Sequence, residues 1–203
     1  NYKVTAVTRN IHQKGYILKT QANAGYLDIV ECNIFNESKL KDLIKKTDIC
    51  INLIGILFES NKGNTFKNIH IIFPALISKI CKDHNVKQLI HLSALGIDLA
   101  KESKYALSKT EGEIQIKKNF SNVTILRPSL VYSVDDNLTT NFMTLLNRMP
   151  IFPIFGNPKF VPIHVSDLVE IIYQVILKEI KSTTIECIGP VSYTHLRAHE
   201  TRH

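Results

Sequence analysis

A tyrosine and a lysine stand four residues apart in the stretch SKYALSKTEGE (103–113), at Tyr105 and Lys109. If the stretch is helical, the two side chains lie one turn apart on the same face. A phenol has a pKa near 10 and needs a neighbouring cation to exchange protons near neutral pH. The spacing fits either a proton-transfer pair or two ordinary side chains of a helix, so the surrounding elements must decide.

Strand-like and helix-like segments alternate along the chain as far as about residue 134. Continuous apolar runs such as DICINLIGIL (48–57) are typical of strands buried on both faces of a parallel sheet. The order predicts an α/β fold with a Rossmann-type, doubly wound parallel sheet. Only turn residues are expected between the first two strands. The predicted strands are 2–9, 26–34, 48–57, 87–95 and 123–132, and the predicted helices cover about 37–46, 65–84 and 103–119.

The regular alternation ends after the turn residues Asp135 and Asp136. We expect a helix at about 138–148 and another at 166–178. Between them, the proline-rich PIFPIFGNP (150–158) is expected either to pack over a substrate cleft or to contact a partner. The chain is therefore divided into a first domain (1–134) and a partial substrate-side region (135–190).

The last residues, VSYTHLRAHETRH (191–203), are polar and share no periodicity with the segment before them. They match the translation of a transposon-end adapter used in sequencing libraries, and we interpret them as an artefactual tail. The spacing of His195, His199 and His203 would otherwise suggest a metal-binding face. No metal site is predicted.

Composition excludes some classes of function. The net charge of +7 comes largely from scattered lysines, as on solvated helix faces, and not from a basic stripe interleaved with aromatics. Nucleic-acid binding is therefore not expected, whereas an anionic membrane surface or an acidic partner stays open. Four widely spaced cysteines favour reduced thiols and a cytoplasmic setting. No run approaches the ~20 apolar residues that span a bilayer.

Small or polar residues lie in the last part of the predicted strands, at the carboxyl edge where ligands bind in such sheets. They are Gly55, Ser93 and Arg127-Pro128-Ser129, and the helix with Tyr105 and Lys109 follows Ser93. In this order they resemble the short-chain dehydrogenase/reductase superfamily, in its extended and atypical, epimerase/dehydratase-like branches. The subfamily typified by the NDUFA9 accessory subunit of respiratory complex I is the most similar. The motifs that carry the resemblance are INLIGILFE (51–59), QLIHLSALG (88–96), SKYALSKTEGE (103–113), TILRPSLVYS (124–133) and PIHVSDLVE (162–170).

The resemblance implies a glycine-rich turn between the first strand and the first helix, and this chain has none. We therefore expect that YKVTAVTR (2–9) corresponds to the family's second strand. On this interpretation, the sequence is truncated by the first strand and the pyrophosphate-binding turn, a unit of about 30 residues.

The resemblance assigns a set of residues to a nicotinamide cofactor. Arg9 ends a strand where NAD-preferring enzymes carry an acid, so NADP(H) is expected over NAD(H). Asn33 and Ile34 correspond to the position beside the adenine. The segment from Asn52 through Leu53 to Gly55 is expected to line the cofactor. Arg127 and Pro128 match a family motif that precedes the substrate region.

The resemblance makes Tyr105 the acid/base and makes Lys109 the cation that lowers its pKa and binds the nicotinamide ribose. The third member is a hydroxyl at the end of the preceding strand, where this chain has Ser93 followed by Ala94. If that hydroxyl belongs at the second position, Ala94 has removed it. His164 and Asp167 match a family segment, and Asp167 is also expected at a helix N-terminus.

Three functions follow from the resemblance. The first is an NADPH-binding protein with a structural, assembly or quinone-associated role at respiratory complex I and little catalysis. Its partners would be complex I subunits, or else a quinone or a membrane surface. It would be located in the cytoplasm or on the cytoplasmic (matrix-equivalent) face of the inner membrane. The second is an active oxidoreductase or sugar-nucleotide epimerase/dehydratase that uses Tyr105 and Lys109. The third is a nucleotide sensor similar to NmrA.

Overall fold

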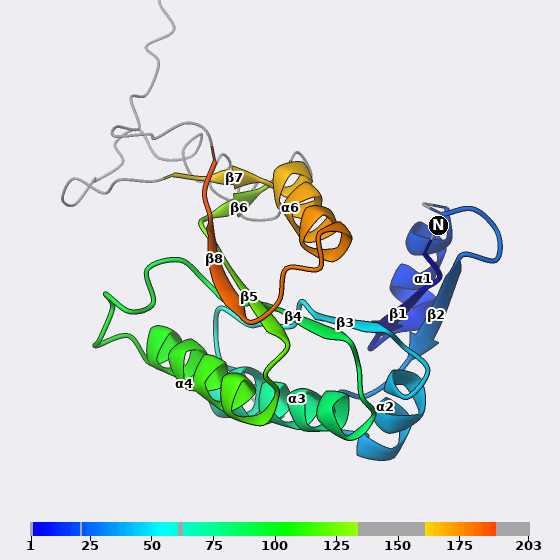
Figure 1. Ribbon diagram of the computed structural model, residues 1–203, viewed down its shortest axis with the longest axis horizontal. Coiled ribbons are helices and arrows are strands. Elements are labelled where there is room, and N and C mark those ends of the chain that lie inside the picture. The colour runs from blue at the N-terminus through cyan, green and yellow to red at the C-terminus, as the bar shows by residue number, and fades with distance from the viewer. Residues whose placement is uncertain (1, 21, 61–62, 134–160, 190–203) are drawn as a thin grey trace, which may run out of the picture.

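The computed structural model describes residues 2–20, 22–60, 63–133 and 161–189, and within them it is an α/β fold (Figure 1). Every strand pairing is parallel, which confirms the predicted fold class. The predicted helix at 138–148, the proline-rich segment and the tail lie outside the described residues. The elements are β1 (Val4–Thr8), α1 (Ile11–Lys19), β2 (Leu27–Glu31), α2 (Glu37–Ile44), β3 (Ile49–Asn52), η1 (Lys67–Ile72), α3 (Phe73–Asp83), β4 (Gln88–Leu92), α4 (Lys104–Asn119), β5 (Val123–Pro128), β6 (Val131–Tyr132), β7 (Ile163–His164), α6 (Val165–Leu177) and β8 (Thr183–Cys187).

Several elements differ from the sequence-based expectation. The stretch before β2 forms the helix α1, where only turn residues were expected. Gly15 lies inside this helix and lowers its intrinsic propensity, so the sequence carried little helix signal. The strands β7 and β8 were not predicted. Three of the five residues of β8 are polar, so no apolar run marked it. The strand expected at 48–57 is shorter in the structure and ends at Asn52.

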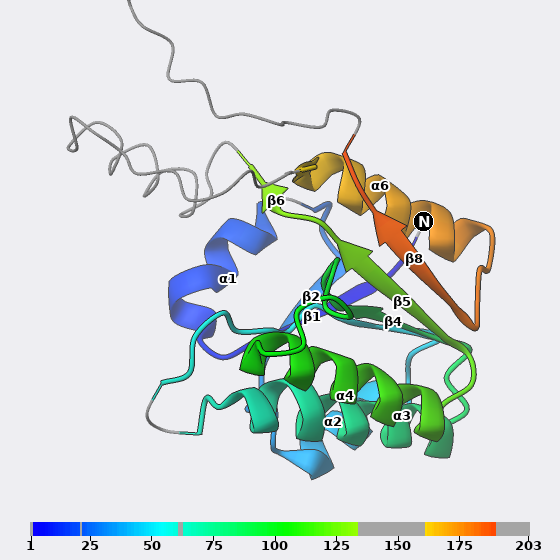
Figure 2. The same ribbon diagram turned by 90° about the vertical axis from the view of Figure 1, so that its left-hand side faces the viewer.

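Helices cover both faces of the sheet, as the doubly wound prediction requires. Figure 2 shows α2, α3 and α4 on one face and α6 on the other. Successive residues of a strand point to opposite faces. Accordingly, Leu89 and Ile125 belong to the core under α3 and α4, whereas Ile90 and Leu126 belong to the core under α6. The four cysteines are free thiols, as predicted, and all but Cys50 are buried.

The parallel strands form three sheets within the described residues. One has the order β3-β4-β5-β8, and the other two are the pairs β1-β2 and β6-β7. Apolar side chains are exposed on the edge strands β1 and β3, with Val4 at 50% and Ile51 at 41%, and Leu53 directly after β3 is 59% exposed.

A close backbone approach between η1 and α4 fixes the helix that carries the tyrosine–lysine pair. Pro74 lacks an N–H group, so the carbonyl of His70 loses its donor four residues later, and the chain forms the π-helical turn η1. Gly112 of α4 packs against this carbonyl. A Cβ at position 112 would lie 1.9 Å from the His70 oxygen, so only glycine allows the contact.

Candidate functional site

The carboxyl ends of β3 and β4 meet the first half of α4, and three of the expected residues come together there. Ser103 caps α4 by accepting a hydrogen bond from the Ala106 N–H, which places Tyr105 in the first turn. Lys109 lies one turn further, and its ammonium group contacts the end of β4 at the Leu92 carbonyl. Gly55 follows β3 and lies against the same ammonium group, because a Cβ there would be 3.2 Å from Nζ. A glycine therefore leaves Lys109 room at this edge.

Lys109 is a buried cation, only 5% exposed. Its Nζ donates one described hydrogen bond, to the Leu92 carbonyl at 3.3 Å, although an ammonium group has three donors. Desolvation lowers the pKa of Lys109 to about 8, and the nearby negative charge of Glu113 opposes this shift. The group is thus still mostly protonated at neutral pH and retains donors for a ligand.

Ser93 is the predicted catalytic hydroxyl, directly after the residue that binds Lys109. Its backbone N–H donates to the Leu126 carbonyl at 2.7 Å, which places the residue firmly on the sheet edge. The residue is 6% exposed, and its Oγ is the one buried side-chain oxygen or nitrogen in the described part of the chain that has no hydrogen-bond partner. Buried hydroxyls are nearly always paired, so an unpaired one directly after the residue that Lys109 contacts points to a ligand.

The tyrosine itself is packed for binding more clearly than for proton transfer. The Tyr105 ring makes edge contacts with His70 and Phe66, at centroid distances of 5.4 and 5.9 Å. Burial raises the pKa of Tyr105 above its ordinary value. A tyrosine that acts as a base near neutral pH needs the opposite shift. In this structure the phenol is therefore protonated at neutral pH and available as a hydrogen-bond donor.

His70 belongs to the same cluster, and the sequence analysis did not single it out. Its Nε2 accepts a hydrogen bond from the Ile56 N–H at 3.1 Å, so the proton resides on Nδ1, 2.9 Å from the Ser108 hydroxyl. Ser108 in turn donates to the Tyr105 carbonyl at 2.7 Å. Desolvation is the main cause that lowers the pKa of His70 to about 4, so the ring is neutral. A lone histidine in a predicted helix gave no spacing signal.

Asn52 is buried and committed to contacts within the protein. Its Oδ1 accepts from the Ile54 N–H at 3.1 Å, and its Nδ2 lies 3.0 Å from Nδ1 of His91. The amide therefore shapes the turn after β3, which leads to Gly55. Leu53, by contrast, is 59% exposed at this turn. Both positions stay predicted cofactor contacts, with Asn52 acting through the backbone that it orders.

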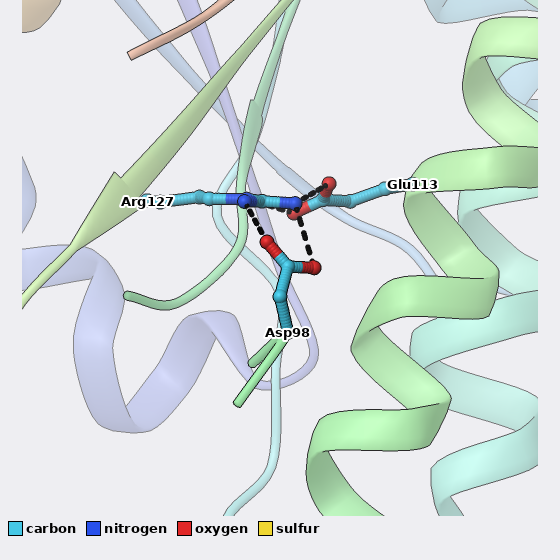
Figure 3. A network of polar contacts seen from close by, with 3 residues as sticks. All are labelled: Asp98, Glu113 and Arg127. Carbon is cyan, nitrogen blue, oxygen red and sulfur yellow. Dashed lines mark hydrogen bonds and ion pairs between the residues drawn. The ribbon is translucent and has the colours of Figure 1, made fainter. Parts of the chain in front are cut away.

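Arg127 lies in an ion-pair network, which Figure 3 shows from close by. Its guanidinium group binds both oxygens of Glu113, at 2.9 and 2.7 Å, and reaches Asp98 in the loop before α4 at 2.5 Å. The Glu113 side chain is 4% exposed, so this ion pair is buried on the Glu113 side. These carboxylates, chiefly Glu113, raise the pKa of Arg127 further. Arg127 thereby ties β5 to α4 one turn beyond Lys109, while its cofactor role stays a prediction.

The remaining expected cofactor residues lie elsewhere. Pro128 is buried at the end of β5, where its carbonyl accepts from the Leu95 N–H at 2.9 Å. Arg9 is exposed directly after β1. Ile34 is a core residue, and Asn33 forms a turn by accepting from the Phe35 N–H at 2.9 Å. The structure therefore does not bring these residues to the Lys109 cluster.

One carboxylate bears on the predicted adenosine end. Glu31, at the end of β2, accepts a hydrogen bond from the Ile11 N–H at the start of α1, at 2.9 Å. An anion at a helix N-terminus is stabilised by the free N–H groups and the helix dipole. The start of α1 thus already holds a negative charge close in sequence to Arg9.

The two residues matched to the family's later segment define the start of α6. His164 is its N-cap, and Nδ1 accepts from the Ser166 N–H at 3.3 Å. Its ring packs edge-on against Tyr132 at 5.2 Å. Asp167 lies in the first turn, as expected for a carboxylate at a helix N-terminus. No group of three or more metal-ligating side chains occurs within residues 2–20, 22–60, 63–133 and 161–189.

A parallel α/β sheet with a tyrosine, a lysine and a serine at its carboxyl edge defines a class of nucleotide-binding protein, and comparison gives the family. The model of the NAD dependent epimerase/dehydratase family matches residues 1–187, and the chain belongs to this family.

Among curated proteins, the chain is similar to subunits of mitochondrial NADH dehydrogenase. It is 25% identical over 178 residues to the NADH-ubiquinone oxidoreductase 40 kDa subunit of Neurospora crassa, covering 87% of this chain and 47% of that protein. It is 26% identical over 125 residues to the NADH dehydrogenase (ubiquinone) 1 alpha subcomplex subunit 9 of Mus musculus, and the match covers 62% of this chain and 33% of that protein. The chain spans about half, or less, of the length of these relatives. The predicted likeness to NDUFA9 is confirmed.

Solved structures share the fold. UDP-glucuronic acid 4-epimerase from Bacillus cereus, in complex with NAD, superposes with a TM-score of 0.77 at 19% identity, covering 95% of this chain and 72% of that one. The dTDP-4-dehydrorhamnose reductase of Bacillus anthracis, in complex with NADP, superposes with a TM-score of 0.71 at 16% identity, and the match covers 96% of this chain and 77% of that one. The Rossmann architecture is therefore confirmed.

Proposed function

We propose that this chain is the nicotinamide-nucleotide-binding part of an atypical short-chain dehydrogenase/reductase protein of the NDUFA9 type. Its role is structural, in assembly, or associated with a quinone, with the cofactor held and little turned over. The observation that carries the binding function is the buried ammonium group of Lys109, whose one described hydrogen bond goes to the Leu92 carbonyl, directly before Ser93 with its unpaired hydroxyl. These donors fit the hydroxyls of a ribose and the polar edge of a nicotinamide.

Two features favour binding over chemistry. Burial raises the pKa of Tyr105, so the phenol is a donor and not a base near neutral pH. Ala94 stands where a second hydroxyl would be. When bound, the cofactor would supply hydride chemistry, whereas Tyr105, Lys109 and Ser93 would orient it by hydrogen bonds.

For the cofactor we propose NADP(H) over NAD(H), on the exposed cation of Arg9 after β1. The Glu31 carboxylate at the start of α1 works against a phosphate there, so Arg9 would have to outweigh it. We propose no metal.

Partners and location follow from the relatives, whose names place them in mitochondrial NADH dehydrogenase. We propose that the full protein associates with respiratory complex I subunits, with a quinone or membrane surface nearby, on the cytoplasmic or matrix-equivalent face. The described residues contain no helix that could cross a bilayer.

The test is nucleotide binding and turnover by purified protein from the complete gene. NADPH fluorescence should report binding that Lys109→Gln weakens, while the matched exposed variant Lys104→Gln leaves it unchanged. Arg9→Gln should weaken NADPH more than NADH. Unaltered NADPH binding by a folded Lys109→Gln variant would refute the proposed site.

The second candidate is an active oxidoreductase or epimerase/dehydratase, and the unpaired Ser93 hydroxyl favours it. In this mechanism Ser93 would polarise a substrate oxygen and Tyr105 would exchange its proton. Steady turnover of a quinone or a sugar nucleotide that both Ser93→Ala and Tyr105→Phe abolish would establish it. Absence of turnover together with retained NADPH binding would leave the binding function in place.

A further inference from the structure

A second candidate site lies at the opposite end of the sheet from Lys109. A cavity of about 560 Å³ is lined by residues that precede strands, including Lys87 before β4, Asn122 before β5 and Lys181 before β8. Tyr105 and Lys109 lie at the carboxyl ends, so the two sites are on different edges. The volume lies within the range of small-molecule sites, about 300–1,000 Å³.

The lining of this cavity is strongly cationic. Five lysines from four segments of the chain line it, and no carboxylate is among the lining residues, which are Lys82, Asn85, Val86, Lys87, Lys117, Lys118, Asn119, Phe120, Ser121, Asn122 and Lys181. The sequence shows these lysines as scattered, 99 positions apart from first to last. Only folding gathers them.

Part of this charge is already balanced. Lys87 pairs with Asp48 at 2.8 Å, and Lys181 pairs with Glu179 at 3.1 Å. Lys82, Lys117 and Lys118 have no ion pair among the described residues. They lie at the C-termini of α3 and α4, each of which carries about half a negative charge. Five cations less two carboxylates and about one unit of helix charge leave an excess of about two positive charges.

The surroundings select the kind of anion. The apolar lining residues, Val86 and Phe120, are 3% and 7% exposed, so the cavity offers neither an aromatic platform for a base nor an apolar surface for lipid chains. An adjoining cavity of about 380 Å³ shares Lys117 and Ser121 and is lined by the hydroxyl residues Thr183 and Thr184 and by Ser182, whose hydroxyl already donates to the Ser121 carbonyl. Ammonium groups next to hydroxyl groups are the donors that phosphate oxygens accept from.

We propose that this lysine cavity binds a phosphate monoester dianion, carried by a compact ligand. The excess of about two positive charges matches the charge of one such group near pH 7. The site is separate from the proposed nucleotide site and does not depend on it.

The test is calorimetric titration of the purified chain with inorganic phosphate at low ionic strength. Lys117→Gln/Lys118→Gln should weaken binding about tenfold or more, since each lost ammonium removes a charge-assisted hydrogen bond. The matched control, Lys39→Gln/Lys46→Gln at α2, changes the net charge equally and should bind as the parent does. Both residues are exposed.

A second arm distinguishes the source of the phosphate. Co-sedimentation with phosphatidylcholine vesicles that contain phosphatidic acid, lost in the Lys117/Lys118 pair alone, would support a lipid headgroup as the ligand. Binding of free phosphate without vesicle binding supports a soluble ligand. Equal weakening in both double variants, or binding of neither probe by the parent chain, overturns the proposal.

Discussion

Arg127→Met removes the guanidinium group that Glu113 and Asp98 share and leaves Glu113 buried, with its side chain 4% exposed, without its ion-pair partner (Figure 3). Breaking a buried ion pair by removing one partner costs about 3–5 kcal/mol, because the remaining charge is uncompensated. The total free energy of unfolding of a small domain is about 5–15 kcal/mol, so the variant should lose a large part of its stability. The Asp98 side chain is 57% exposed, and Asp98→Asn should cost less than about 1 kcal/mol.

The measurement is urea denaturation of four proteins: the parent, the single variants Arg127→Met and Asp98→Asn, and the double variant Arg127→Met/Glu113→Met. The double variant should be more stable than Arg127→Met, because neither member of the buried ion pair is then left without the other. Two results would contradict the argument: a double variant less stable than Arg127→Met, or a cost for Asp98→Asn that equals the cost for Arg127→Met. Either would mean that burial of Glu113 is not the source of the energy.

Three further predictions follow from the site. Gly112→Ala should lower the free energy of unfolding by about 1–3 kcal/mol or more, because the new Cβ meets the His70 carbonyl, and thermal denaturation measures this loss. As a control on the same helix, Ile114→Ala should have little effect on stability, because Ile114 is 53% exposed. His70 is neutral when folded, with a pKa of about 4 against an ordinary 6.5, so only the unfolded chain gains its proton between these values. Stability should therefore fall, by up to about 1.4 kcal/mol per pH unit, as the pH drops from 6.5 to 4, and less in His70→Asn; an unchanged slope would contradict this assignment. Nucleotide affinity should weaken as the pH rises through about 8, where Lys109 loses its proton. Glu113→Gln should move the midpoint of this pH dependence to a lower pH, because the Glu113 charge raises the pKa of Lys109. An affinity that does not change between about pH 7 and 9.5 would exclude Lys109 as a donor.

Most of the sheet could be predicted from sequence because its signals are local. The apolar runs that became β4 and β5 are buried on both faces and are therefore rich in apolar residues, whereas β3 is an edge strand within a similar apolar run. The helix α4 was predicted at 103–119 and spans Lys104–Asn119. The helix α1 and the strand β8 were missed, because Gly15 weakens the helix signal of one and polar residues make up most of the other. β8 is stabilised by its pairing with β5, which lies far away in the sequence.

The sequence by itself determined the spacing of Tyr105 and Lys109 and their place after Ser93, since both depend on helix periodicity and strand order. The tertiary structure alone decided which groups meet there. It placed Arg127 against Glu113, put His70 under the tyrosine ring, and left the Ser93 hydroxyl unpaired. It also gathered five scattered lysines around one cavity. The physical reason is that hydrogen bonds and ion pairs act over a few ångströms, and only folding brings distant segments that close.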